Sequence, residues 1–198
     1  KMSKSLGNFF TVRDVLKQYR GEEIRFFVLS SHYRSALNYS DDQLKESRAA
    51  IERLYTALRH VDAVENSIKS PYIERFEKAM NDDFNTAKAI SVMFECANEL
   101  NKLKMTAPDE ASKLASDLLK MGEPLGLIGQ DPEEFLHSDM GAKSTIKSDA
   151  IEKAIARRLQ AKLDKNWALA DQIRDELKDQ GVILEDAGKE TTWRRASA

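Results

Sequence analysis

The chain has 198 residues, 32% of them charged and 41% hydrophobic, and its formal net charge is −2. Its one cysteine excludes a disulfide framework, its three widely spaced histidines give no metal-ligand pattern, and its short apolar runs predict neither a signal peptide nor a membrane partner. With eight Gly and four Pro, the composition is typical of a mainly helical, cytoplasmic protein.

The chain begins with residues 1–5, which read KMSKS. Lys1 and Lys4 carry compact, mobile charges that suit a phosphate group which moves during a reaction, and Gly7 allows the tight turn of a loop. Two lysines at this spacing, taken alone, are more typical of an exposed terminus. Because a phosphate loop needs a sheet to position it, we expect the chain to be the later part of a longer protein.

Two helix signals follow the loop. Thr11 and Asp14 have the spacing of a capping box, and Gly21 is expected to end the helix that they begin. Residues 24–29 form a dense apolar segment that favours a second, largely buried helix. A buried strand is the alternative, because periodicity alone does not separate the two.

Helical spacing of apolar residues recurs throughout residues 40–137 and predicts an antiparallel helical bundle. Ser40 begins a helix that we expect to run to about residue 65, and Pro71 suits the first turn of the next helix. Later helices are expected to begin near residues 85, 106 and 131.

Two neighbouring carboxylates, Asp82 and Asp83, precede one of these helices. Such pairs occur in metal sites and in acid–base catalysis. Beside Asn85 and Thr86, however, helix capping is their more common role, so we assign no site to them.

The C-terminal part has a different pattern. Residues 138–147 lack periodicity and are rich in small and polar types, which indicates an interdomain linker. The elements expected after it are helices at 149–165 and 167–180 and strands at 182–184 and 191–194. We expect the two helices to face each other through Ile151, Ile155, Leu159, Leu163, Trp167, Ala170, Ile173 and Leu177. The predicted fold class is therefore mainly α: an antiparallel helical bundle followed by a small α+β domain with two helices and a β-hairpin.

Several separate motifs, in a fixed order, carry a family resemblance. The KMSKS string resembles the signature loop of class I aminoacyl-tRNA synthetases. Among these enzymes, the remainder of the chain is similar to bacterial cysteinyl-tRNA synthetases. The strings that carry this similarity are SHYRS (31–35), LNYS (37–40), MNDDFNT (80–86), ADQIRDEL (170–177) and TTWRR (191–195).

The resemblance implies a layout and a set of partners. Residues 1–39 would hold the KMSKS loop and a stem-contact region, residues 40–137 the helical bundle, residues 138–147 the linker, and residues 148–198 a small anticodon-binding domain. ATP with Mg²⁺ would be used by the full enzyme, and tRNA(Cys) and an N-terminal catalytic domain would be the partners of this chain. The family's zinc ligands lie in that N-terminal part, so we expect no metal or cofactor here, no activity of the chain alone, and a monomer.

The resemblance also implies site residues. Lys1 and Lys4 are expected to be catalytic, with Lys4 contacting ATP and both neutralising the charge of the departing pyrophosphate. The candidates for tRNA binding are Asp186, Trp193, Arg194, Arg195, Arg157 and Arg158. Trp193 and the arginines that follow it suit stacking on unpaired bases, although a core position in the hairpin is the alternative for Trp193. For Arg157 and Arg158 the alternative is a solvated helix face.

Two other functions remain open from the sequence. One is a non-catalytic helical module that binds RNA or protein and carries coincidental lysines. The other is the equivalent part of a class I synthetase for a different amino acid.

Overall fold

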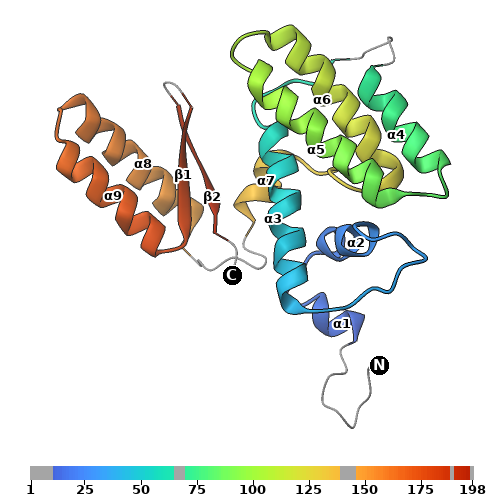
Figure 1. Ribbon diagram of the computed structural model, residues 1–198. Helices are drawn as coiled ribbons and strands as arrows, with labels where there is room; N and C mark the ends of the chain where they lie inside the picture. The colour runs from blue at the N-terminus through green and yellow to red at the C-terminus, as the bar shows by residue number, and fades with distance from the viewer. Residues whose placement is uncertain (1–10, 65–69, 139–145, 188–189, 197–198) are drawn as a thin grey trace. The chain divides into compact units, whose positions relative to one another are not determined.

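The computed structural model describes residues 11–64, 70–138, 146–187 and 190–196. The chain divides into two compact units, Lys1–Pro132 and Glu133–Ala198. The described part of the chain is mainly helical and contains one two-stranded antiparallel sheet (Figure 1), which confirms the predicted fold class.

The described part of the first unit is built from helices. These are α1 (Val12–Val15), α2 (Gly21–Leu29), α3 (Asp41–Leu58), α4 (Pro71–Asn81), α5 (Thr86–Leu103), α6 (Pro108–Gly122) and the short 3₁₀ helix η2 (Glu123–Leu125). Helices α4, α5 and α6 lie side by side, and α2 packs on α3 (Figure 1). Residues 24–29 are therefore helical, and the alternative of a buried strand is wrong.

Polar side chains fix the starts of these helices. The Thr11 hydroxyl accepts a hydrogen bond from the Asp14 backbone N–H (3.1 Å), and the Asp14 carboxylate accepts one in return from the Thr11 N–H (3.4 Å), which confirms the predicted capping box. Ser40, Ser70 and Asn85 each accept a hydrogen bond from the backbone N–H three residues further on. These caps satisfy donors that a helix start otherwise leaves without partners.

Helix α3 is shorter than predicted, because it ends at Leu58 and not near residue 65. Arg59 leaves the helical conformation with a ψ of 137°, and His60 is left-handed with a φ of 57°. A non-glycine residue in that conformation interrupts a right-handed helix whatever the apolar spacing beyond it. The Lys104 ammonium donates to the carbonyl of Arg59 (3.2 Å) and so satisfies an acceptor at the buried end of the helix.

Helix α2 also differs from its predicted pattern of burial. Glu22 and Glu23 are buried, whereas Val28 is half exposed. The reason lies on α3, where Arg48 Nε donates to Glu23 (3.1 Å) and the Tyr55 hydroxyl donates to Glu22 (3.0 Å). Buried carboxylates are tolerated where such donors meet them.

The second unit is a small mixed domain. Its elements are α7 (Pro132–His137), which begins at the last residue of the first unit, α8 (Ser148–Leu163), α9 (Trp167–Asp179), β1 (Val182–Ala187) and β2 (Glu190–Arg195). The strands pair antiparallel, with Leu184 opposite Trp193. Gly181 ends α9 in the left-handed conformation, with a φ of 76°, as a glycine at this position typically does.

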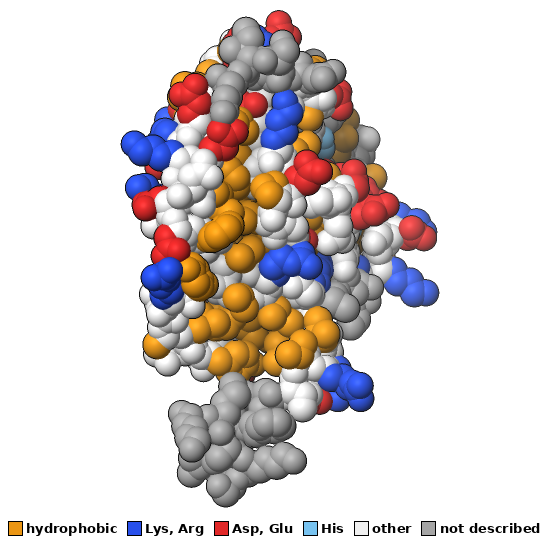
Figure 2. Space-filling model, turned by 90° about the vertical axis from the view of Figure 1, so that its right-hand side faces the viewer, with side chains coloured by type: hydrophobic (Ala, Val, Ile, Leu, Met, Phe, Trp, Pro, Cys, Tyr) orange, Lys and Arg blue, Asp and Glu red, His pale blue; other side chains and the backbone are white. Residues whose placement is uncertain are grey.

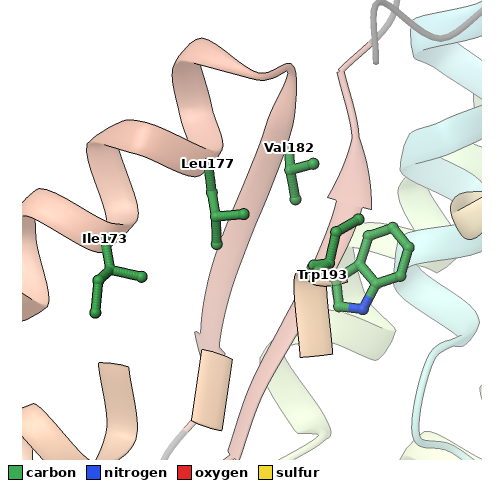
Figure 3. Close-up of a cluster of buried hydrophobic side chains, with 5 residues drawn as sticks. Ile173, Leu177, Val182 and Trp193 are labelled. Atoms are coloured by element: carbon green, nitrogen blue, oxygen red, sulfur yellow. The ribbon is translucent and has the colours of Figure 1, made fainter. Parts of the chain in front are cut away.

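The core of the second unit lies between the helices and the hairpin. Figure 3 shows Ile173 and Leu177 on α9, Val182 on β1 and Trp193 on β2. With Ile151 of α8, these buried side chains form one apolar cluster. The cluster joins both helices to both strands, so the hairpin depends on the helices for its stability.

Three apolar residues that we expected inside this core are exposed: Leu159, Leu163 and Trp167. The prediction placed Leu159 and Leu163 on one helix, facing Trp167 on the next. The chain turns between α8 and α9 close to where we expected, with Lys165 left-handed at a φ of 58° and Asn166 capping α9. Leu163 is the last residue of α8 and Trp167 the first of α9, so both lie at helix ends beside the turn and outside the apolar cluster.

Hydrophobic side chains also gather at the surface among charged ones (Figure 2). In the described part of the first unit, the large exposed ones are Val12, Leu16, Val28, Tyr33, Leu37, Val64, Phe84, Met105 and Leu119. None of the described helices combines the length and apolar character needed to cross a membrane.

Candidate nucleic-acid interface

Arg158 and Asp186 form the centre of a charged cluster on the second unit. The Arg158 guanidinium donates two parallel hydrogen bonds to the Asp186 carboxylate, Nη1 to Oδ1 at 2.8 Å and Nη2 to Oδ2 at 2.9 Å. Thr191 donates to the same carboxylate at 2.6 Å, and Lys162 at 3.2 Å. This is the planar, two-pronged geometry that makes an arginine–carboxylate pair strong and directional.

The pKa values of the pair reflect this geometry. The hydrogen bond from Arg158 holds the pKa of Asp186 well below its usual range, and those from Thr191 and Lys162 act in the same direction. The hydrogen bond to Asp186 raises the pKa of Arg158, and the charges of Asp186 and Asp171 add to it against the effect of burial. Both groups are therefore charged at neutral pH, and Asp186 still has 44% of its side chain exposed.

Trp167 is the first residue of α9, the helix that carries Asp171. The two residues are four positions apart on α9, so their side chains share a face, and the charge of Asp171 acts on Arg158. Trp167 is 60% exposed, which is unusual for so large an aromatic side chain. An exposed indole thus shares a helix face with a carboxylate whose charge acts on Arg158.

Of the residues that the sequence suggested for tRNA binding, the charged cluster contains Asp186 and Arg158, whereas the Arg195 guanidinium lies over the Trp193 ring, 5.5 Å from its centre. Arg157 is exposed on α8 but lies outside the charged cluster. Arg194 donates to Glu185 on the neighbouring strand at 2.8 Å. Arg195 is buried and donates to the backbone carbonyls of His137 (3.0 Å) and Ile146 (2.8 Å).

Trp193 does not form the exposed tip that the sequence suggested. It is 2% exposed, its indole stacks on the His137 ring at 3.8 Å, and its ring N–H donates to Glu152 at 2.6 Å. A base has no access to this ring, so the geometry favours the alternative in which Trp193 holds the hairpin core. The aromatic residue that is accessible is Trp167, which sequence reasoning placed in the core.

A local signal for Trp167 was present in the sequence. Asn166 is a strong capping residue, and a residue directly after a cap occupies the first helical position. The predicted boundary between 165 and 167 accordingly placed Trp167 on a helix separate from Leu159 and Leu163. Only the packing of α8 on α9 shows that this position faces outward.

The remaining candidate groups are placed as follows. Lys1 and Lys4 lie outside the described residues, and their roles stay predictions. Cys96 is buried, and burial raises the pKa of its thiol to about 12, so it is neither a nucleophile nor a ready metal ligand at neutral pH. Among the residues that the structure describes, no three His, Cys, Asp or Glu side chains gather in a way that would hold a metal ion.

Three family models match separate stretches of the chain. Residues 1–49 match the catalytic domain of class I (C) tRNA synthetases, residues 75–129 the DALR domain, and residues 148–194 the cysteinyl-tRNA ligase anticodon binding domain. The cluster around Asp186 and the exposed Trp167 both fall within the last of these.

Curated relatives are similar along nearly the whole chain. Cysteine–tRNA ligases of Tolumonas auensis, Idiomarina loihiensis and Escherichia coli are 51%, 50% and 52% identical to it, over 98%, 99% and 98% of its length. The chain spans 42% of the length of each of these relatives.

Proposed function

Because this chain belongs to the cysteine–tRNA ligase family, we propose that it is the tRNA-binding part of an enzyme that activates cysteine with ATP and transfers it to tRNA(Cys) in the cytoplasm. The observation that carries the proposal is the exposed Trp167, which shares a face of α9 with Asp171, the residue whose charge acts on Arg158 in the Arg158–Asp186 cluster. Trp167 and this cluster both belong to the stretch that matches an anticodon binding domain.

The chemistry of this surface suits unpaired bases. Anticodon bases expose their faces for stacking and their edges for hydrogen bonding. The Trp167 ring offers a stacking plane, Lys162 offers donors, and the carboxylates of Asp186 and Asp171 offer acceptors for base amino groups. Since Arg158 already fixes Asp186, the acceptor is held in one orientation before RNA binds.

We assign a role in the activation of cysteine to the N-terminal end of the chain. Lys1 and Lys4 lie in the stretch that matches a class I catalytic domain. We assign to Lys4, assisted by Lys1, the neutralisation of charge on the pyrophosphate of ATP·Mg²⁺ as it leaves. The pockets for cysteine and adenine and the zinc ligands of the family are assigned to the rest of the enzyme, so this chain alone is expected to form no cysteinyl adenylate.

The test of anticodon recognition compares the chain with its Trp167→Ala variant for binding to tRNA(Cys) transcripts with the natural and an exchanged anticodon. We expect the substitution to weaken binding to the natural transcript by about 1–3 kcal/mol, the usual contribution of one base–aromatic stack. Because Trp167 is mostly exposed, thermal stability should stay the same. Met105→Ala is the matched control, since it removes another exposed large apolar side chain from the first unit.

Two results would count against the proposal. Unaltered discrimination between the two transcripts by folded Trp167→Ala protein would refute recognition through this surface. Failure of the unsubstituted chain to prefer any tRNA would favour a non-catalytic module.

A further inference from the structure

Three consecutive residues of the first unit converge on one carboxylate. The Tyr33 hydroxyl donates to Asp83 Oδ1 at 2.8 Å, Arg34 Nη2 donates to the same oxygen at 3.2 Å, and Arg34 Nε lies 3.1 Å from Oδ2. The Nε2 atom of His32 lies 3.8 Å from Oδ2. Arg34 also donates to the Tyr33 hydroxyl at 2.8 Å, so Tyr33, Arg34 and Asp83 form one closed network, here called the Asp83 latch, with His32 beside it.

The backbone beneath the latch is in an unfavourable conformation. Asp83 and Phe84, which join α4 to α5, are both left-handed, with φ of 53° and 52°. Asp tolerates this region, but a bulky residue such as Phe occupies it only where the surroundings enforce it, and Phe84 is 67% exposed. Packing of the phenyl ring therefore does not account for the strained turn. The turn places the Asp83 carboxylate against residues 32–34.

The latch joins two segments that match different family models. Residues 32–34 lie in the connection between α2 and α3, within the stretch that matches the class I catalytic domain. Asp83 lies in the stretch that matches the DALR domain. Among the described residues, helix α2 packs on α3, and α3 packs on α5. The latch adds a separate, polar attachment between the α2–α3 connection and the α4–α5 turn.

We propose that Asp83 is a positioning residue for the transfer of cysteine to tRNA, an inference that rests on the proposed function. By fixing the connection between α2 and α3 against the bundle, it holds the segment that carries the KMSKS loop in the orientation that bound tRNA requires. The role that we assign to Asp83 is exerted through Tyr33 and Arg34, the side chains that donate to it. Without the Asp83 carboxylate, the segment that carries the KMSKS loop would adopt a wider range of orientations relative to the bundle. The fraction of enzyme molecules in the orientation that binds tRNA would then fall, and the apparent dissociation constant for tRNA would rise in proportion.

The test uses the full-length ligase that carries this sequence and its Asp83→Asn variant. Asn keeps the size and the tolerance for a left-handed conformation but removes the charge. Two activities are measured: ATP–pyrophosphate exchange with cysteine and no tRNA, and charging of tRNA(Cys) over a range of tRNA concentrations. We expect the KM for tRNA to rise by about fivefold to tenfold, as suits a partly exposed network of charged hydrogen bonds, while exchange stays within about twofold of the unsubstituted enzyme.

Two further variants sharpen the comparison. Tyr33→Phe removes one donor and keeps the ring; we expect it to raise the KM less than Asp83→Asn does, and to add little in the Asp83→Asn background because both act on one network. Asp82→Asn is the matched control, since this neighbouring carboxylate is exposed and lies outside the latch. It should leave both activities unchanged.

The possible failures are distinguishable. Equal losses of exchange and charging, accompanied by a lower melting temperature, would show a purely structural role and overturn the proposal. A native KM for tRNA in folded Asp83→Asn and Tyr33→Phe enzymes would overturn it as well. Absence of charging by the unsubstituted ligase would instead refute the proposed function, and this role with it.

Discussion

The two tryptophans of the second unit have opposite environments, and the difference assigns them different roles. The ring N–H of Trp193 donates to Glu152, and the ring stacks on His137. Because its one polar group has a hydrogen-bond partner, this large side chain can be buried. Trp167 follows the cap of α9 and remains exposed. A buried ring contributes stability to the hairpin, whereas an exposed ring is available to a partner.

At the same scale, Lys4→Ala in the full-length ligase should slow cysteine-dependent pyrophosphate exchange by about 10²-fold, the usual cost of removing one preorganised charged donor. The loss should appear in kcat and not in KM, because charge on the pyrophosphate develops in the transition state. Lys17→Ala is the control, since Lys17 is exposed and pairs with Asp14. A normal exchange rate would remove Lys4 from the mechanism.

At the scale of elements, α2 is anchored by buried acidic residues at its start. Glu22 accepts hydrogen bonds from the Tyr55 hydroxyl, from the backbone N–H of Ile128 and from the Gln130 side chain (3.1 Å). Burial raises the pKa of Tyr55, and the charge of Glu22 adds to the effect, so the hydroxyl stays protonated and donates. One carboxylate therefore ties α2 both to α3 and to the segment after α6.

This arrangement predicts that Glu22→Ala lowers the free energy of unfolding by about 2–4 kcal/mol, because it leaves buried donors without an acceptor. Urea denaturation followed by circular dichroism measures the change. Glu46→Ala, on the exposed side of α3, is the control and should change the free energy of unfolding by less than about 0.5 kcal/mol. If the two variants unfold at the same urea concentration, the anchoring of α2 by Glu22 is wrong.

At the scale of the whole molecule, the two units have separate cores, and the second begins well before the stretch that matches the anticodon binding model. His137 on α7 stacks on Trp193, and its backbone carbonyl accepts from Arg195. Ile146 packs against the core cluster and accepts from Arg195 as well. The predicted domain boundaries and the linker at 138–147 stay predictions, since residues 139–145 lie outside the described ranges.

These contacts predict that a fragment of residues 133–198 is more stable than one of residues 148–198. The shorter fragment loses an aromatic stack and two hydrogen bonds to Arg195, which together contribute about 2 kcal/mol or more. Thermal unfolding of both fragments measures the difference. Equal melting temperatures would show that the segment before α8 contributes nothing to the stability of this unit.

The sequence by itself determined the family, the helical fold class and most helix starts, because these depend on local signals. Thr11, Ser40, Pro71, Asn85 and Asn166 act on backbone groups within a few residues, and ordered motifs identify relatives without any knowledge of packing. The prediction of two helices and a β-hairpin in the C-terminal part also depended on local signals, namely apolar spacing and turn residues.

Tertiary structure alone decided which side chains face the core and which face a partner. Whether Glu22 is buried depends on Tyr55 and Ile128, 33 and 106 residues away in the chain. Whether a tryptophan is available depends on the turn between α8 and α9 and on the packing of α7. Burial is a property of surfaces that meet only when distant segments fold together, so residue type and spacing do not specify it.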